Sequence, residues 1–276
     1  MISNIKDCTL LNNGVRMPWL GFGVFKISDG QEVEQAVSYA LEAGYRSIDT
    51  AAVYGNERGV GKAIRESGIP REDIFLTTKV WNDDQRERRT LAAFEESLQR
   101  LGTEYVDLYL VHWPVKGCCQ QTWQVMEEIH QSGRAKAIGV SNFMIHHLED
   151  ILSDGQIVPA VNQIEFHPFL VQPELLEFCQ EHQIQVEAWS PLMQGKIVNE
   201  PSVLEIAEKH QKTPAQIVLR WDLQHEVVTI PKSVHLDRIV ENARIFDFEL
   251  SEVDMNALDA LDQGKRVGPD PDSFGF

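Results

Sequence analysis

The sequence predicts an α/β protein whose repeated strand–helix units close into a (β/α)8 barrel. First, short β-rich runs alternate with longer amphipathic stretches along the whole chain. Second, these runs number eight, and no linker or low-complexity tract divides the 276 residues, so residues 1–276 are expected to form a single barrel domain. Third, an open doubly wound sheet would need a GxGxxG turn after its first strand, but Gly21-Phe22-Gly23 leads on to Val24 and Phe25.

Residue type and spacing predict the individual elements. Thr213 followed by Pro214 suits a helix start, and Gly44 and Gly133 suit helix ends. Apolar residues at helical spacing predict helices that include 31–43, 86–101, 122–132, 173–182 and 214–223. Strand-forming runs bounded by turn residues predict strands at 19–23, 47–49, 75–80, 106–112, 135–141, 160–165, 185–189 and 228–231.

The segment before the first strand, from Cys8 to Met17, reads as a β-hairpin. Its Asn13-Gly14 pair is typical of a tight type I′ turn. We expect this hairpin to close the floor of the barrel.

Composition narrows the class of function. A net charge of −17 argues against general binding to nucleic acid or to an anionic membrane, since both need a basic face. No run approaches the ~18 apolar residues of a membrane span, which predicts a cytoplasmic protein. No obligate protein partner is inferred, and a monomer is expected. Cys8, Cys118, Cys119 and Cys179 lack metal-type spacing and are expected to be reduced thiols.

Four polar residues fall at or just after the carboxyl ends of predicted strands, where barrels of this kind carry their reacting groups. Asp49 closes the second strand, Tyr54 lies in the next loop, Lys79 is in the last turn of the third strand and His112 closes the fourth. Each alone has an ordinary explanation, as a helix cap, a packed aromatic, a solvated strand end or a core histidine. Their joint placement favours chemistry.

The four residue types suit the reduction of a carbonyl group. A lysine inside an apolar barrel needs a counter-charge, and Asp49 is one strand away from Lys79. A neighbouring ammonium favours a phenolate, so we expect Lys79 to make Tyr54 a better proton donor. His112 is able to donate a hydrogen bond to the same substrate oxygen.

Three long segments of the sequence resemble the aldo-keto reductase family: GYRSIDTAAVYGNE (44–57), KAIGVSNF (136–143) and IPKSVHLDRIVENARI (230–245). The likeness runs essentially the whole chain. EAWSPLMQGK (187–196) and the short tail look most like the bacterial branch that includes diketogluconate and methylglyoxal reductases. The resemblance implies that aldehydes or ketones are reduced with NADPH, with Tyr54, Lys79, Asp49 and His112 as the catalytic tetrad and Tyr54 as the acid.

The resemblance also implies a cofactor site at the ends of the later strands. It assigns the nicotinamide carboxamide to Ser141, Asn142 and Gln163, the nicotinamide ring to Trp189, the adenosine 2′-phosphate to Lys232, Ser233 and Arg238, the adenine to Glu241 and Asn242, and the pyrophosphate to loop residues Ser190, Leu192 and Gln194. In an acidic protein, Lys232 and Arg238 also form a compact pair of cations, and the planar donor fork of arginine matches phosphate. NADPH is therefore expected over NADH.

Aromatic residues in the loops after the early strands predict a substrate pocket. Phe25, Trp81 and Trp113 should form an aromatic wall, with Val53 beside it and His112 at its base. Phe25 stands where many relatives have Trp.

Two other classes of function remain open, because fold does not determine function. One is a non-catalytic NADP(H) sensor. The other is a barrel hydrolase or lyase, which needs two facing acids or a metal cluster. Glu165 at a strand end and His146-His147 at a helix start have no visible partner in the sequence, so no metal site is predicted.

Overall fold

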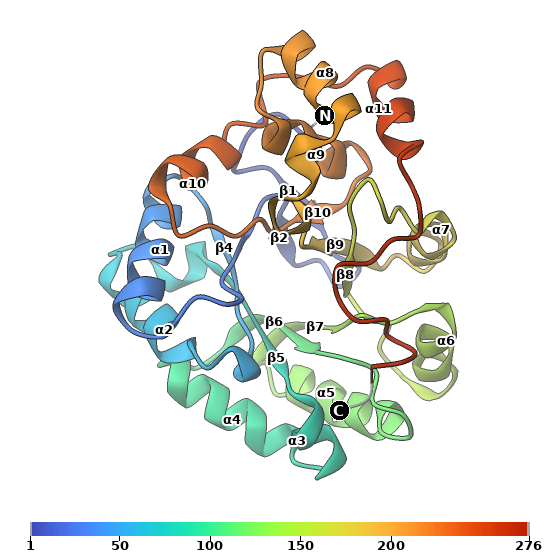
Figure 1. Ribbon diagram of the computed structural model, residues 1–276. Coiled ribbons are helices and arrows are strands. Elements are labelled where there is room, and N and C mark those ends of the chain that lie inside the picture. The colour runs from blue at the N-terminus through green and yellow to red at the C-terminus, as the bar shows by residue number, and fades with distance from the viewer. Residues whose placement is uncertain (1, 275–276) are drawn as a thin grey trace.

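Eight parallel strands form the barrel in the computed structural model, which describes residues 2–274 (Figure 1). They follow one another in sequence order around the sheet: β3 (Phe22–Gly23), β4 (Ser47–Asp49), β5 (Phe75–Val80), β6 (Val106–Val111), β7 (Ala135–Ser141), β8 (Val161–Glu165), β9 (Gln185–Trp189) and β10 (Val228–Thr229). A parallel bridge between Leu20 and Thr229 joins the first strand to the last and closes the barrel. The predicted fold class and its eight strands are confirmed.

Helices surround the strands on the outside of the barrel (Figure 1). They are α1 (Gln31–Glu42), α2 (Glu57–Glu66), α3 (Asn82–Arg86), α4 (Thr90–Leu101), α5 (Cys119–Gln131), α6 (Ile145–Asp154), α7 (Pro173–Glu181), α8 (Pro201–His210), α9 (Pro214–Gln224), α10 (Leu236–Asn242) and α11 (Glu252–Asp259). None of these described helices is long and apolar enough to cross a bilayer.

The helix predicted over 86–101 is wrong as a single element. Arg88 adopts a left-handed conformation (φ 57°), so the chain leaves α3 and re-enters a helix only at Thr90. An L-residue cannot continue a right-handed helix from that conformation. The predicted helix start at Thr213 is confirmed, since its side chain accepts a hydrogen bond from the backbone of Gln216.

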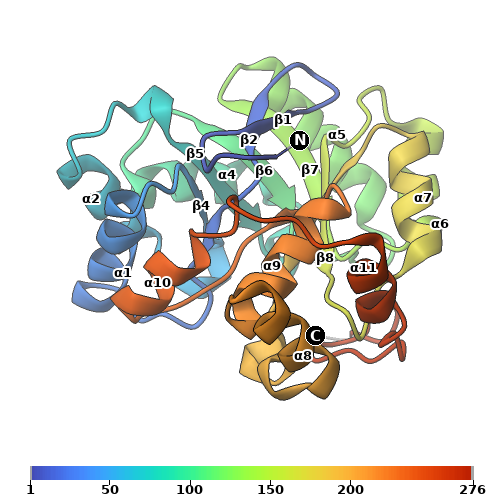
Figure 2. The ribbon, with the colours of Figure 1, turned by 90° about the horizontal axis from the view of Figure 1, so that it is seen from above.

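The N-terminal hairpin pairs β1 (Cys8–Leu10) with β2 (Arg16–Pro18) and lies at one end of the barrel (Figure 2). Leu11 and Met17 pack against Phe75 and other inward residues of the barrel strands, so the hairpin closes the floor as expected. The type I′ turn is wrong. Gly14 donates to the carbonyl of Leu11, and Gly14 has a positive φ (85°) while Asn13 does not. The loop is therefore a three-residue turn with glycine at its left-handed position.

The four cysteines are free thiols, as expected. Two lie in the core, where burial raises the pKa of both the Cys119 and the Cys179 thiols to about 12. These thiols stay protonated at neutral pH and act as small apolar side chains.

Candidate active site

The predicted ion pair between Lys79 and Asp49 is present and buried. The Lys79 ammonium lies 2.7 and 2.8 Å from the two carboxylate oxygens of Asp49 and 2.9 Å from the carbonyl oxygen of Thr50. Strands β4 and β5 are parallel neighbours, so both side chains reach the inside of the barrel near its carboxyl end. Burial lowers the pKa of Lys79, but Asp49 and Tyr54 outweigh it and leave the pKa above its usual value. Lys79 is a cation.

Tyr54 ends the short 3-10 helix η1 (Ala52–Tyr54) and turns its hydroxyl toward that pair, 3.5 Å from the Lys79 nitrogen. As expected, Lys79 lowers the pKa of Tyr54, but burial has the larger effect. Burial raises the pKa of Tyr54 to about 12, and the opposing effect of Lys79 is partly cancelled by Asp49. A lysine that is already neutralised by a carboxylate acidifies a phenol only weakly. Tyr54 is thus a protonated donor at neutral pH.

His112 follows β6 and lies edge-on to the Tyr54 ring, with ring centroids 5.6 Å apart. Burial, helped by Lys79, holds the pKa of His112 well below its usual value, so its ring is neutral. Nδ1 is buried and has no partner among the described residues, while Nε2 is not enclosed in this way. Nε2 is therefore the nitrogen open to the barrel mouth.

The residues predicted to hold the nicotinamide carboxamide form one hydrogen-bonded group beside the tetrad. The Asn142 side-chain nitrogen donates to the carbonyl oxygen of His112 (2.9 Å) and to Ser141 Oγ (3.0 Å). The Trp189 indole donates to Asn142 Oδ1 (2.8 Å). Gln163 donates to Asp49 (2.8 Å), which links this group directly to the tetrad. The ends of five strands, β4 and β6 to β9, thus meet at one place.

Left-handed backbone is concentrated at the predicted cofactor residues that follow β7 and β9. Asn142 (φ 66°), Ser190 (φ 52°) and Gln194 (φ 57°) all have positive φ, and Leu192 lies between the last two. Non-glycine residues hold this conformation at a cost, and such positions are common at ligand sites.

The predicted phosphate clamp lies after β10 and in α10. Lys232 and Arg238 are exposed, whereas Ser233 is buried. No described carboxylate pairs with Arg238. The hydrogen bonds from Ser28 lower the pKa of Glu32, and the positive charge of Lys232 adds a weaker electrostatic effect in the same direction. A cation with no protein counter-ion in an acidic chain is available to an anion.

The two residues predicted to contact adenine differ in their surroundings. The Glu241 carboxylate accepts a hydrogen bond from Thr213 at the start of α9 (2.9 Å). Asn242, at the end of α10, is buried.

The predicted substrate wall forms only in part. Phe25 and Val53 are about half exposed, at 52% and 43%, and Phe25 packs on Tyr54 at 4.9 Å between ring centroids. Trp81 lies edge-on to His112. Trp113 is 7% exposed, because Phe274 stacks on it at 4.0 Å. Phe274 was not predicted from the sequence, because it lies in the short C-terminal tail outside any predicted strand or helix.

The C-terminal segment runs over the β8 side of the barrel toward α6, on the side opposite the hairpin (Figures 1 and 2). Glu165 anchors it by accepting hydrogen bonds from the backbone of Val267 (2.5 Å) and Gly268 (3.2 Å), and it also lies 3.0 Å from His167. Glu165 therefore has partners that the sequence did not reveal. A Cβ on Gly268 would lie 2.3 Å from the Trp189 ring, so this segment packs closely against the predicted nicotinamide site.

His146 and His147 also acquire a partner. Asp272 lies 3.0 Å from His146 and 3.5 Å from His147, which overturns the expectation that this pair stands alone. The three offer ligand-type atoms within 4.8 Å of one another at the surface. However, Nδ1 of His147 accepts the backbone N–H of Met144, so only its Nε2 faces Asp272. The group is a polar contact between α6 and the tail.

Glu187 is a buried acid that was not predicted from the sequence. It is fully buried in β9, and its carboxyl group accepts a hydrogen bond from Gln163 (2.7 Å). A charged residue between the apolar Val186 and Ala188 of the predicted strand 185–189 was the available signal. Gln163 donates to both Asp49 and Glu187, and Lys79 also binds Asp49, so the two acids are occupied by protein groups rather than facing each other across a hydrolase site.

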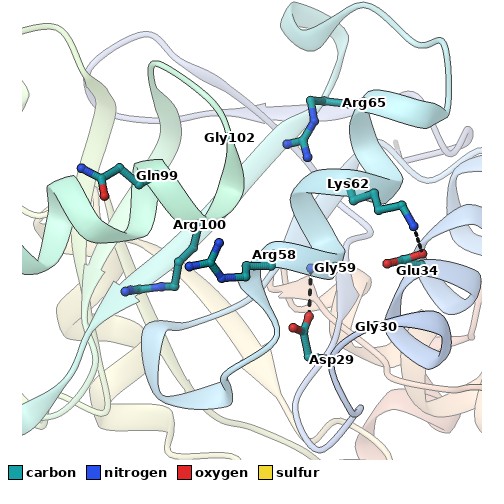
Figure 3. Close-up of a pocket in the computed structure, with 10 residues that line it drawn as sticks. All are labelled: Asp29, Gly30, Glu34, Arg58, Gly59, Lys62, Arg65, Gln99, Arg100 and Gly102. Atoms are coloured by element: carbon teal, nitrogen blue, oxygen red, sulfur yellow. Dashed lines mark hydrogen bonds and ion pairs between the residues drawn. The ribbon is translucent and has the colours of Figure 1, made fainter.

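A surface hollow of about 310 Å³ lies elsewhere, between α1, α2 and α4 (Figure 3). Its lining is basic, but Lys62 is paired with Glu34 (2.6 Å) and Arg65 donates to the carbonyl oxygen of Leu101 (2.7 Å). No tetrad residue lines it.

Comparison with known proteins agrees with this geometry. The chain is 56% identical to glyoxal reductase of Bacillus subtilis, over all of both chains, and 47% identical to methylglyoxal reductase DkgA of Escherichia coli, over 96% of this chain and 97% of that one. Among solved structures, an aldo-keto reductase from a deep-sea metagenome library is 44% identical, with a TM-score of 0.94, over 97% of this chain and 100% of that one. A variant of Gox0644 in complex with NADPH is 43% identical, with a TM-score of 0.93, over 98% of each chain.

The family model described as the aldo/keto reductase family matches residues 19–263, which include the whole tetrad and the phosphate clamp. The residues at the strand ends, the buried ion pair and the full-length relatives all point to the same family. The chain belongs to the aldo/keto reductase family and is an NADP-dependent oxidoreductase.

Proposed function

We propose that this enzyme reduces small reactive aldehydes and ketones, α-dicarbonyls among them, with Tyr54 as the proton donor. The observation that carries the proposal is that the Tyr54 hydroxyl lies 3.5 Å from the Lys79 ammonium while its ring packs edge-on against the neutral His112 ring. The glyoxal and methylglyoxal reductases among its relatives support the substrate class.

The residues present fit NADPH. Arg238 is a cation with no partner among the described residues and is available to bind the 2′-phosphate, and Ser233 follows Lys232 directly in the sequence. The side-chain oxygen of Gln163 accepts no hydrogen bond from a described residue. When bound, NADPH supplies the hydride for the carbonyl carbon.

The chain's own residues then handle the oxygen. His112 donates a hydrogen bond from Nε2, which stabilises the negative charge that develops on the oxygen. Tyr54 transfers its proton to that oxygen and completes the alcohol. The resulting phenolate is stabilised by Lys79, whose own charge Asp49 holds in place. Solvent at the mouth returns a proton to Tyr54.

Tyr54→Phe tests this assignment. We expect it to lower kcat for methylglyoxal by roughly 100- to 10,000-fold, because the proton donor is lost. The Kd for NADPH should stay within about twofold, since less than ~0.5 kcal/mol of binding energy is at stake. NADPH oxidation followed by absorbance and a fluorescence titration measure the two quantities.

Tyr39→Phe is the matched control. It also removes one tyrosine hydroxyl, one that accepts a hydrogen bond from Gln35 on α1, away from the barrel mouth. A Tyr54→Phe enzyme as active as this control would exclude Tyr54 as the proton donor.

A further inference from the structure

A second buried carboxylate lies behind the predicted nicotinamide site. Glu187 on β9 sits beside Gln163 on β8 in the parallel register, and both side chains are buried. The Gln163 side-chain nitrogen lies 2.7 Å from Glu187 Oε2 and 2.8 Å from Asp49 Oδ2. Asp49 comes from β4, which is not adjacent to β8 in the sheet. The two acids therefore hold one amide group from two sides of the barrel interior.

This arrangement determines which end of the amide points inward. A primary amide nitrogen has two hydrogens, and each is used by one carboxylate. The amide oxygen in the same place would face the Asp49 carboxylate, which is paired with Lys79 and has no hydrogen to donate, so the nitrogen points inward. The side-chain oxygen of Gln163 then points away from the two acids, and no described residue donates a hydrogen bond to it. Gln163 is left with an acceptor and no spare donor.

We propose that Glu187 is a positioning residue that, together with Asp49, keeps the oxygen of Gln163 turned toward the cofactor as an acceptor for the N–H group of the nicotinamide carboxamide. This inference rests on the proposed function, in which Gln163 contacts that carboxamide. Without Glu187, one hydrogen of Gln163 loses its partner, and Asp49 alone holds the amide in this orientation. A turned amide would offer a donor, which suits the carboxamide oxygen and so the opposite orientation of the nicotinamide ring.

The ionisation state of Glu187 leads to a second, separate expectation, about the pH dependence of the reaction. Glu187 Oε1 is buried without a partner, and burial together with Asp49 raises the pKa of Glu187 to about 8. At neutral pH the acid is neutral and still accepts the hydrogen bond from Gln163. The charged and titratable groups that face it are Asp49 from β4, Lys79 from β5 and Tyr54 from η1.

Ionisation of Glu187 above pH 8 adds a negative charge that raises the pKa of Tyr54 and so weakens it as a proton donor. The structure therefore links the expected fall of kcat at alkaline pH to the ionisation of Glu187. We expect kcat to fall as the pH rises through about 8, and Glu187→Gln to remove that fall because the amide cannot ionise.

Two variants at position 187 and one elsewhere test the proposal. Glu187→Gln keeps an acceptor for Gln163, whereas Glu187→Met keeps the volume and removes the acceptor. Asp222→Asn is the matched control, because Asp222 is another fully buried acid with one oxygen bound, to Thr229 (2.6 Å), and the other without a partner. The NADPH Kd without substrate, kcat, KM, the pH profile and the melting temperature are measured for each.

We expect Glu187→Met to raise the Kd for NADPH and to lower kcat, each about tenfold, the equivalent of one lost hydrogen bond of ~1.4 kcal/mol. Glu187→Gln should keep the Kd within about twofold of wild type, a difference below ~0.5 kcal/mol, and lose only the alkaline fall. Asp222→Asn should share any loss of melting temperature but keep the wild-type Kd and pH profile.

The outcomes separate the two proposals. A wild-type enzyme that binds NADPH but reduces no carbonyl would contradict the proposed function. The Kd values of the Glu187 variants for NADPH would still test the positioning role of Glu187. If Glu187→Met binds NADPH as tightly as Asp222→Asn does, or if Glu187→Gln weakens binding as much as Glu187→Met, the positioning role is wrong. A wild-type protein that binds no NADPH overturns both.

Discussion

Arg238 and Lys232 provide the positive charge on which our proposed preference for NADPH depends. The chain has a net charge of −17, so an anionic cofactor must be held by a local cluster. Both side chains are exposed, and Arg238 has no partner among residues 2–274. A free guanidinium loses little when it turns to a phosphate.

Arg238→Ala is expected to raise the Kd for NADPH by roughly 10- to 100-fold, because a charge-assisted hydrogen bond contributes about 1.5–3 kcal/mol. The Kd for NADH, which lacks the 2′-phosphate, should change little. Fluorescence titrations with both cofactors measure the difference. Arg244→Ala removes an exposed cation just after α10 and controls for net charge. Equal weakening of NADH and NADPH would show that the phosphate is not held by Arg238.

At the scale of elements, the first turn of α11 is joined to the end of α8 by one carboxylate. Asp254 accepts hydrogen bonds from Ser251 Oγ (2.7 Å), Lys209 Nζ (2.7 Å) and the nearest ring nitrogen of His210 (2.9 Å). Burial raises the pKa of Asp254, but these donors outweigh it and hold the pKa well below its usual range. The acid both caps α11 and packs it on α8.

Asp254→Asn is expected to lower the free energy of unfolding at pH 7 by about 1–3 kcal/mol, since bonds to a charged acceptor are lost. The folded pKa lies below the unfolded value of ~3.9, so this stabilisation is complete above about pH 5 and is lost progressively as the pH falls toward the folded pKa. Urea unfolding at pH 7 and at pH 3 should show the variant and wild type converging at the lower pH. Glu252→Gln, an exposed acid in the same turn, serves as the control. A pH-independent difference would show that charge is not the cause.

At the scale of the whole molecule, stability and chemistry lie at opposite ends of the barrel. The hairpin fills the floor, and the tetrad stands at the carboxyl ends of β4 to β6. This division is common to (β/α)8 enzymes, in which the floor contributes mainly to stability. Figure 2 shows the hairpin and the C-terminal segment on opposite sides.

Met17→Ala tests that division. Met17 is fully buried in the floor cluster, so its truncation should lower the free energy of unfolding by about 2–5 kcal/mol. The kcat of the folded enzyme should not change. Chemical unfolding and steady-state kinetics measure the two effects, with Val253→Ala, which is 75% exposed, as the control. A large loss of kcat below the unfolding transition would show that floor and mouth are coupled.

The sequence by itself determined the strands, the closure into a barrel and the pairing of Lys79 with Asp49. Alternating patterns define strands locally, and parallel neighbours bring their carboxyl ends to one rim whatever the loops do. Only the tertiary structure decided that Glu187 and Asp49 share the amide of Gln163, that Phe274 covers Trp113, and that burial outweighs Lys79 in setting the pKa of Tyr54. Those results depend on burial and on contacts between residues far apart in the chain, for which local sequence carries no signal.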